Sequence, residues 1–481
     1  MKEFMMKRLL ILFLTIAALL ASCSEEADFS SNPQYTLEFS SDTVSFDTLF
    51  TAVKSPTATF VVRNRNSKSL RINSVQLASG GESGFSVLVD GQWGSLMQGL
   101  EVRAKDSIFV LASVSLQRNG NNGLHTVRDT LLFGLESGIQ QHVILEACGR
   151  DAVFMRGVTL DSDTLLASGH YIIYDSLVVS PAATLDIAPG TNLYFHDKAF
   201  MRIDGRLNAC GTAEAPVLFR GDRTDNMFSY LPYDRIPGQW EGIVISSTSN
   251  NNVLRHCDIH SANFGIRVER GDTVEERLFL ESSKVQNFHG NALELSMARA
   301  TVVNSLLANA QGNCVKVSGG YVQFVHCTIA NFYVWKLRDV ALALHNSIEG
   351  EPAPLESALF ANCIIEGSKE DEVMGYYTSF GDTLDCSFNY RFENSLINTP
   401  DVQDTCFVNV VYDRPENEFF GALNFMAVDH DIFFYDFHLT PESAARGIAS
   451  EEYHEMAPLD IDGKERPAAN IDAGCYQFVE Q

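Results

Sequence analysis

Four charged residues in the second half of the chain each lie between two apolar residues. They are Arg267 in GIRV, Glu294 in ALEL, Lys316 in CVKV and Lys336 in VWKL. If each tetrapeptide is a short strand, the charged side chain points away from its apolar neighbours, because side chains alternate along a strand. Lysine or arginine can act as a base or neutralise an anion, and glutamate can exchange a proton. We therefore treat the four as ligand-binding candidates, with a solvated charge ladder as the favoured alternative.

Aromatic residues recur near the same segments. Phenylalanine follows asparagine at Asn263, Asn287 and Asn331, and the last of these pairs is followed by Tyr333 and Trp335. Exposed rings would form a platform on which sugar rings stack, whereas buried rings would pack the corners of the fold. We favour the buried interpretation except for Tyr333 and Trp335, which are further ligand-binding candidates.

A repeat must position these residues. The segments RHCDI, ESSKV, VNSLL, VHCTI, LHNSI, ANCII and ENSLI align so that one column of small residues precedes an aliphatic column by two positions. The small column is Cys257, Ser283, Ser305, Cys327, Asn346, Cys363 and Ser395. Copies lie 17 to 32 residues apart, and the segments are rich in Val, Ile, Asn and Gly. A turn of this length is too short for two packed helices, so the pattern favours a β-solenoid with at least two strands per coil.

The repeat resembles the right-handed parallel β-helix of the pectate lyase-like family. Upstream, LVVSPAATLDIAPG, RLNACGTAEAPV and GQWEGIVI are similar to the opening coils of that family, and PLDIDGKERPAANIDAGCYQF is similar to the terminal segment of many β-helix surface proteins. The resemblance implies a C-terminal cap that covers the last coil. It also implies that a charged strip on an outer face is where lyases and hydrolases of this fold keep their working residues.

The strip lacks features that such enzymes need. A lyase requires a base beside a cation that neutralises the uronate, and Lys316 or Arg267 could be the base. No clustered acids accompany the strip to hold calcium, and a single Glu294 is half of the carboxylate pair of a usual hydrolase. DIDG at 460–463 offers only two acids, which is weak support for calcium. We therefore predict no cofactor and no metal site, with calcium as a weak possibility and the catalytic residues unknown.

Cysteines and histidines in the repeat have structural explanations. Neighbouring coils stack about 4.8 Å apart, so Cys327 and Cys363, two coils apart in the alignment, would lie about 10 Å from each other, beyond disulfide reach. We expect buried thiols. The column before them holds His256, Asn304, His326, His345, Asn362 and Asn394; zinc binding is an alternative there, but a hydrogen-bonded ladder at the bend is favoured.

The chain begins with an export leader. Lys2, Lys7 and Arg8 precede an apolar run that is too short to span a bilayer comfortably. Leu20, Ala21 and Ser22 lead into Cys23, which resembles the lipobox of bacterial lipoproteins, so the resemblance implies a lipid on Cys23. The acids after Cys23 resemble a surface-export signal, or simply begin a polar tether. We expect an outer-membrane lipoprotein that is exposed at the cell surface and contacts the membrane through this lipid.

Residues 37–150 read as short alternating strands separated by polar turns, which is typical of an immunoglobulin-like β-sandwich. The predicted organisation is therefore a signal peptide (1–22), a flexible tether (23–36), the sandwich (37–150), a right-handed parallel β-helix (151–440) and a C-terminal cap segment (441–481). The predicted fold class is all-β.

Charge narrows the choice of partners. With 35 basic and 61 acidic residues the formal net charge is −26, so nucleic acid is excluded as an electrostatic partner and acidic polymers are disfavoured. The sequence favours a lipid-anchored surface protein that binds glycan or another extracellular ligand, or has a structural role, without catalysis. The alternative is a polysaccharide lyase or glycoside hydrolase that uses the outer face of the β-helix.

Overall fold

The chain forms two compact units. The computed structural model describes residues 28–120, 123–380, 386–413 and 422–480, and the units are Met1–Asp151 and Ala152–Gln481. Cys23 and the leader lie outside the described residues. Apart from the short 3-10 helices η1 (Tyr233–Arg235), η2 (Ala422–Asn424) and η3 (Glu451–Met456), the described elements are strands, so the predicted all-β fold class is confirmed. Within the described ranges, no helix has the length and apolar character needed to cross a membrane.

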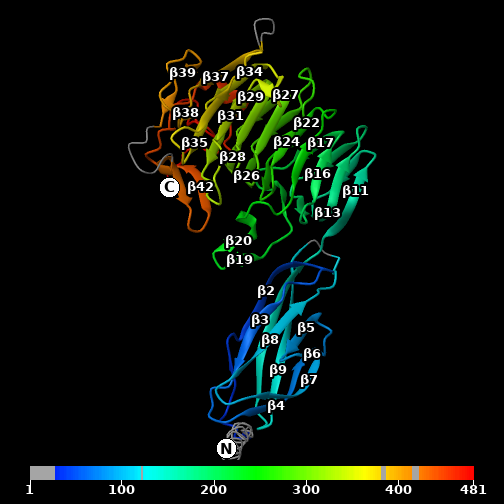
Figure 1. The fold of residues 1–481 in the computed structure, drawn as a ribbon. Coiled ribbons are helices and arrows are strands. Elements are labelled where there is room, and N and C mark those ends of the chain that lie inside the picture. The colour runs from blue at the N-terminus through cyan, green and yellow to red at the C-terminus, as the bar shows by residue number, and fades with distance from the viewer. Residues whose placement is uncertain (1–27, 121–122, 381–385, 414–421, 481) are drawn as a thin grey trace, which may run out of the picture. The chain divides into compact units, whose positions relative to one another are not determined.

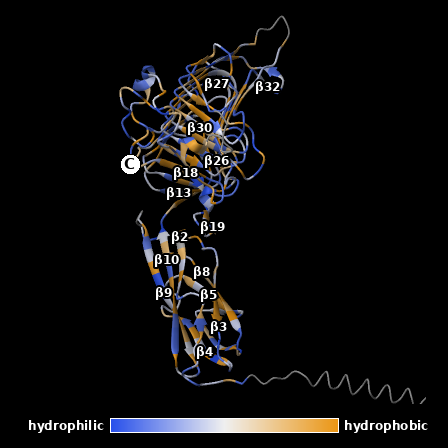
Figure 2. Ribbon diagram, turned by 90° about the vertical axis from the view of Figure 1, so that its left-hand side faces the viewer, coloured by the Kyte–Doolittle hydropathy of each residue, from blue (hydrophilic) through white to orange (hydrophobic). Residues whose placement is uncertain are grey.

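The first unit is a sandwich of two five-stranded sheets. One sheet has the order β1 (Glu38–Phe39), β3 (Ala58–Arg63), β8 (Ser107–Val114), β5 (Phe85–Val89) and β6 (Gln92–Gly94). The other has the order β2 (Thr43–Phe50), β10 (Gln140–Arg150), β9 (His125–Leu135), β4 (Leu70–Leu77) and β7 (Leu96–Val102). Buried and half-buried residues alternate along β5 and along most of β10, and Figure 2 shows hydrophobic and hydrophilic residues within the strands of this unit. The inward side chains form one core between the sheets.

The second unit is a parallel β-helix with three strands in most coils (Figure 1). It begins with β11 (Val153–Leu160), β12 (Thr164–Leu166) and β13 (His170–Val179). Face A then contains β16 (Phe200–Ile203), β21 (Gly242–Ile245), β24 (Ile266–Val268), the first parts of β27 (Leu293–Val303) and β29 (Val315–Val325), β31 (Leu342–His345) and β36 (Val373–Tyr376).

Faces B and C complete each coil. Face B contains β14 (Thr184–Ile187), β17 (Arg206–Cys210), β22 (Asn252–Arg255), β25 (Leu278–Glu281), the second parts of β27 and β29, β34 (Leu355–Ala361), β37 (Phe388–Glu393) and β39 (Phe407–Val408). Face C contains β15 (Asn192–Phe195), β18 (Val217–Gly221), β23 (Cys257–His260), β26 (Lys284–Phe288), β28 (Leu306–Ala310), β30 (Thr328–Asn331), β35 (Ile364–Gly367), β38 (Leu396–Ile397) and β40 (Val411–Tyr412).

Three small hairpins protrude from the coils. They are β19 (Asn226–Phe228) with β20 (Leu231–Pro232), β32 (Ser347–Ile348) with β33 (Glu351–Pro352), and β41 (Phe425–Asp429) with β42 (Phe434–Leu439).

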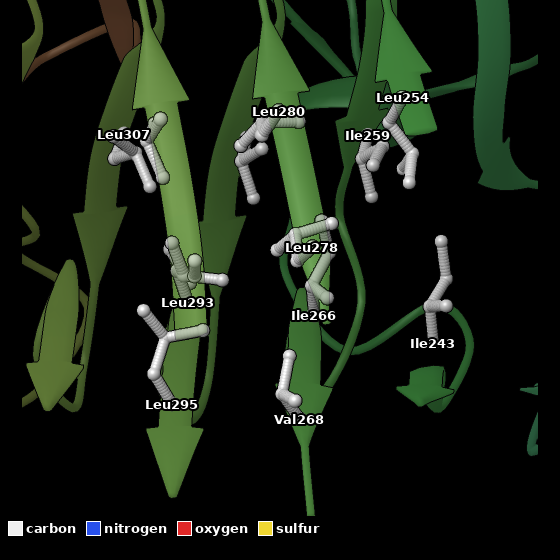
Figure 3. Close-up of a cluster of buried hydrophobic side chains, with 14 of the residues drawn as sticks. Ile243, Leu254, Ile259, Ile266, Val268, Leu278, Leu280, Leu293, Leu295 and Leu307 are labelled. Carbon is white, nitrogen blue, oxygen red and sulfur yellow. The ribbon is translucent and has the colours of Figure 1, made fainter. Parts of the chain in front are cut away.

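Aliphatic side chains from all three faces fill the interior. Figure 3 shows Ile266 and Val268 from face A, Leu278 and Leu280 from face B, and Ile259 from face C pointing into the same core. Because side chains alternate along each strand, the inward residues stack coil upon coil in aliphatic rows. Each fully buried Leu or Ile contributes about 1.5–3 kcal/mol through removal of apolar surface from water.

The repeat column lies where face C begins, with one correction. Six of the seven aligned segments occupy equivalent positions, but LHNSI contains the end of β31 on face A and then β32 of the β32–β33 hairpin. Cys327 and Cys363 are consequently on adjacent coils, and the predicted separation of two coils is wrong. Both remain free, buried thiols, and burial raises the pKa of Cys327 well above its ordinary value.

A hydrogen-bonded ladder closes the bend before this column. The Ser283 hydroxyl donates to the carbonyl of Glu281 at 2.8 Å and accepts the backbone N–H of Cys257 at 3.0 Å. The residue before each column member adopts a left-handed backbone: His256, Ser282, Asn304, His326, Asn362 and Asn394. His345 is not one of them, so its expected place at this bend is wrong; it ends β31.

The C-terminal segment packs along the side of the β-helix instead of over its last coil. The outward side chains of face C, such as Leu306, Ala330 and Ile364, form a second core with Phe437 and Ala473. The expectation of a cap over the last coil is therefore corrected. The reason is that apolar outward residues, such as Leu306, Ala330, Ile364 and Leu396, follow one another on the later coils of face C, so this part of the face needs a cover.

Residues of the terminal segment make specific contacts with the coils. The Arg466 guanidinium is buried and donates to Asn304 Oδ1 at 2.8 Å and to the carbonyl of Gly474 at 3.0 Å. Gly474 has φ of 86°, and a side chain there would clash with Ile364 and Thr328. These contacts fix the segment against face C.

Candidate functional site

Three of the four predicted strip residues lie in register on face A. Arg267 pairs with Glu294, and Glu294 with Lys316, on adjacent parallel strands. The Arg267 Nε and the Lys316 Nζ each lie 3.3 Å from a different Glu294 carboxylate oxygen. We call Arg267, Glu294 and Lys316 the strip. They form a row in which one carboxylate bridges two cations on a rigid sheet.

Lys336 is not part of the strip. It lies in the loop 332–341, and Ala343 occupies the position beside Lys316 on the next coil. The assignment of VWKL to a second strand is therefore wrong. The loop lengthens this coil, and the strand forms seven residues later than the pattern of the previous coils predicts.

Electrostatics limit what the strip can do chemically. Burial by itself would raise the pKa of Glu294, but the charges of Lys316 and Arg267 outweigh it and lower the pKa below its ordinary value. A carboxyl with a lowered pKa is a poor general acid at neutral pH, and an ion-paired carboxylate is a weak base. The strip is thus suited to hydrogen bonding and charge recognition more than to proton transfer.

Aromatic rings flank the strip on the same sheet. The Arg267 guanidinium lies over the Phe264 ring, 4.1 Å from its centroid. On the coil after Lys316, the His345 ring stacks on Tyr376 of the following coil, with centroids 4.4 Å apart and planes 8° apart. Tyr376 is 48% exposed. Face A therefore presents charged groups and at least one accessible ring in fixed positions.

Tyr333 and Trp335 have different environments in the loop 332–341. Tyr333 is buried, and burial raises its pKa to about 12. Trp335 is 36% exposed, and its ring stacks on Phe433 with centroids 4.1 Å apart. Phe264, Phe288 and Phe332 are all buried, as the corner-packing interpretation expects.

Sequence reasoning missed a buried ionic site behind the insertion 223–239. His260 is held between Asp258 at Nδ1 (2.8 Å) and Asp234 at Nε2 (2.7 Å), and Arg220 also contacts Asp234 at 2.8 Å. Burial opposes the charged imidazole, but Asp258 and Asp234 raise the pKa of His260 to about 10. With its pKa raised this far, His260 is protonated near neutral pH and cannot act as a base there. Its role is to anchor the insertion.

Two further segments are anchored in a similar way. Arg338 forms a buried two-pronged pair with Glu372, with N–O distances of 3.0 and 2.5 Å, which fixes the loop 332–341. His438, on β42, bonds Asp436 and also Asp462, the latter at 2.7 Å. The hydrogen bond that His438 donates to the Asp462 carboxylate is the largest of the effects that raise the pKa of His438.

A short sequence pattern marks the sites of His260 and His438. Both occur in Asp-x-His, as DIH at 258–260 and DFH at 436–438. On a strand this spacing places the acid and the imidazole on the same side.

The described residues give little support to metal binding. In residues 28–120, 123–380, 386–413 and 422–480, no three His, Cys, Asp or Glu side chains are grouped to hold an ion. In DIDG, the Asp460 carboxylate accepts backbone N–H groups of Asp462 and Lys464, and the Asp462 carboxylate bonds His438. Both acids that were considered for calcium are thus engaged by protein donors.

The similarity of this chain to known proteins is limited. No protein-family model matches the chain, and no curated protein sequence matches it. Among solved structures, the catalytic domain of a GH87 alpha-1,3-glucanase aligns over 73% of this chain and 86% of its own, with 9% identity and a TM-score of 0.20. A family 123 glycoside hydrolase from Clostridium perfringens aligns over 25% of this chain, with 7% identity and a TM-score of 0.19.

A protein of unknown function from Porphyromonas gingivalis W83 aligns over 26% of this chain and 60% of its own, with 16% identity and a TM-score of 0.18. The aligned part spans 30% of the Clostridium perfringens hydrolase. All these TM-scores lie below the level at which activity or substrate can be transferred, so the function must be argued from the residues themselves.

Proposed function

We propose that this protein is a lipid-anchored, surface-exposed lipoprotein that binds neutral glycan through face A of its β-helix without cleaving it. The observation that carries the proposal is the Glu294 carboxylate, which bridges Arg267 and Lys316 at 3.3 Å on each side. A carboxylate held in this way has no free proton to donate. It can still accept hydrogen bonds from hydroxyl groups while the two cations donate to them.

The surroundings of the strip support a glycan as the ligand. Sugar recognition combines hydrogen-bonding groups with aromatic surface. The strip supplies the hydrogen-bonding groups, and the stacked His345–Tyr376 pair supplies aromatic surface on the same face. The net charge of −26 repels acidic polymers, which favours an uncharged glycan.

The anchoring part of the proposal rests on the leader. A lipid on Cys23 would place two or more acyl chains in the membrane, which suffices for stable attachment. The residues between Cys23 and the sandwich would form the tether. Labelling with a radioactive fatty acid, lost in Cys23→Ala, tests the attachment; unchanged labelling in the variant would contradict it.

A glycan panel tests the binding function. Soluble protein that begins after Cys23 is assayed for retention on neutral polysaccharides and for release of reducing or unsaturated ends. We expect retention without products, and weaker retention in Lys316→Ala. Arg391→Ala is the matched control, because Arg391 also pairs with a glutamate, Glu393, but on face B. Products that disappear in Glu294→Gln would instead establish the enzyme.

A further inference from the structure

Three segments that are far apart in the sequence meet at the corner between faces C and A. They are the insertion 223–239, the loop 332–341 and the β41–β42 hairpin, and Figure 1 shows β19, β20 and β42 on the same side of the coils. The Arg235 guanidinium donates to the carbonyl of Ile432 at 3.3 Å and lies over the Phe434 ring, 5.1 Å from its centroid. Trp335 stacks on Phe433, with planes 12° apart. We call Arg235, Trp335, Phe433 and Phe434 the platform.

Each segment of the platform is fixed at its base by an ionic anchor. Asp234, next to Arg235, bonds the buried His260. Arg338, three residues after Trp335, forms the buried pair with Glu372. His438, in the strand that begins with Phe434, bonds Asp462. The rings are thus held in place before any ligand arrives, which reduces the entropy lost on binding.

Backbone strain points to the same place. Phe433 has φ of 52°, in the left-handed region that bulky residues rarely adopt. This conformation places its ring on Trp335. Strain of about 1–3 kcal/mol is tolerated where the surrounding structure enforces it, and such residues concentrate at binding sites.

The platform is open to solvent and rimmed by both signs of charge. Trp335 and Phe434 are 36% and 40% exposed, and the apolar surface continues over Leu337, which is 96% exposed. Lys336, Asp339 and Asp431 are exposed neighbours in the same segments, so donors and acceptors surround the rings without a dominant charge. Partly exposed aromatic rings with a mixed polar rim fit the apolar faces of uncharged pyranose rings.

The loop 332–341 also links the platform to the strip. Asn313 Nδ2 donates to the carbonyl of Val340 at 2.8 Å, and the backbone N–H of Asn313 donates to Asn291 Oδ1 at 2.8 Å. These two asparagines lie three residues before Lys316 and Glu294, respectively. The platform therefore begins at the corner from which the strip strands start.

We infer that the platform is a stacking subsite for neutral pyranose rings of the same glycan that the strip contacts. This inference rests on the proposed glycan-binding function and assigns it a ligand class and a second contact. The strip supplies hydrogen bonds to hydroxyl groups, and the platform supplies a stacking surface for ring faces.

Tryptophan fluorescence tests the platform directly. The chain has three tryptophans: Trp93 in the sandwich is exposed, Trp240 is fully buried, and Trp335 is in the platform. In a Trp93→Phe background, cellohexaose, maltohexaose and mannohexaose are titrated into the protein that begins after Cys23. We expect at least one sugar to change the emission of Trp335, with the midpoint that calorimetry gives for binding. Trp335→Ala should weaken that binding at least tenfold.

Controls separate the two proposals. Phe228→Ala removes an exposed ring that stacks on Tyr230 in the same insertion but outside the platform, and it should leave affinity unchanged. Sugar binding with no Trp335 response, and with full affinity in Trp335→Ala, overturns the platform and leaves the proposed function intact. Absence of binding to every sugar, in this titration and on the polysaccharide panel, overturns both. Loss of self-association in Trp335→Ala, with no sugar response, would identify a protein-docking surface instead.

Discussion

Faces A and C of the β-helix are built from the same backbone, yet one is bare and the other is covered. The outward residues of face A include Arg267, Glu294 and Lys316, which satisfy one another through ion pairs. The outward residues of face C include Leu306, Ala330 and Ile364, which pack under the C-terminal segment. The outward positions of a solenoid strand therefore decide whether its face serves as a surface or as a second core.

The largest difference in stability between the faces should appear when an outward residue of each is replaced by aspartate. Ile364→Asp buries an unpaired carboxylate under the C-terminal segment and should lower the free energy of unfolding by more than about 4 kcal/mol. Met374→Asp, on the outward row of face A, should change it by less than about 0.5 kcal/mol. Urea unfolding of both variants checks this; equal losses would remove the distinction between the faces.

Breaking a buried ion pair should likewise cost more stability than breaking the exposed pair on face A. Arg338→Met leaves Glu372 buried without its partner and should cost about 3 kcal/mol. Arg267→Met, at an exposed pair, should cost less than about 1 kcal/mol.

The double variant Arg338→Met/Glu372→Leu sharpens this test. Replacing a whole buried pair by apolar residues is often close to neutral, so the double variant should recover most of the loss that thermal or urea unfolding records for Arg338→Met. A double variant as unstable as the single one would show that the loop depends on the pair for more than charge compensation.

The anchor at His260 should weaken at alkaline pH. Its folded-state pKa of about 10 exceeds the ordinary value of 6.5, so its stabilisation is complete below pH 6.5 and is lost as pH rises toward 10. Over this pH range the free energy needed to open the insertion 223–239 should fall by about 2 kcal/mol or more. We therefore expect proteolysis within the insertion to accelerate. His260→Gln should remove the pH dependence, whereas a substitution of the exposed His196 should not.

The Glu294 carboxylate of the strip should contribute little to stability. Glu294→Gln removes one charge from a partly exposed row and should change stability by less than about 1 kcal/mol. It should nevertheless weaken glycan retention, because the amide replaces one acceptor by a donor and releases both cations. Retention equal to that of the unaltered chain would exclude the carboxylate from the binding site.

The sequence predicts the fold class well because the solenoid repeats its pattern. The aliphatic column that ends in Ile365 and Ile397 marks inward positions, and the alternation in GIRV, ALEL and CVKV places three charges in one row. The prediction fails at LHNSI and VWKL, where the lengthened loop 332–341 shifts the strand away from the local pattern. Local periodicity carries no information about a loop inserted between a corner and the next strand.

The candidate site is only partly visible in the sequence. Trp335 and Lys336 are identified as candidates, but Phe433, which stacks on Trp335, and Glu372, which pairs with Arg338 in the same loop, are distant in the chain. The function of Arg338 as an anchor depends on burial, which no local pattern reveals. Asp-x-His at 258–260 and 436–438 is the exception, since the period of a strand predicts which side chains meet.

The C-terminal segment also changes how the β-helix should come apart. In an ordinary solenoid each coil contacts only its neighbours, so coils can fray one at a time from either end. Here Arg466 bonds Asn304, the Gly474 N–H bonds the carbonyl of Asn362, and the Tyr453 hydroxyl bonds Glu393, so one segment joins coils that are not adjacent. Stepwise fraying would first have to detach residues 453–474 from the coils. The coils should consequently melt together, and a growing chain should gain this cooperativity only after this segment has been synthesised.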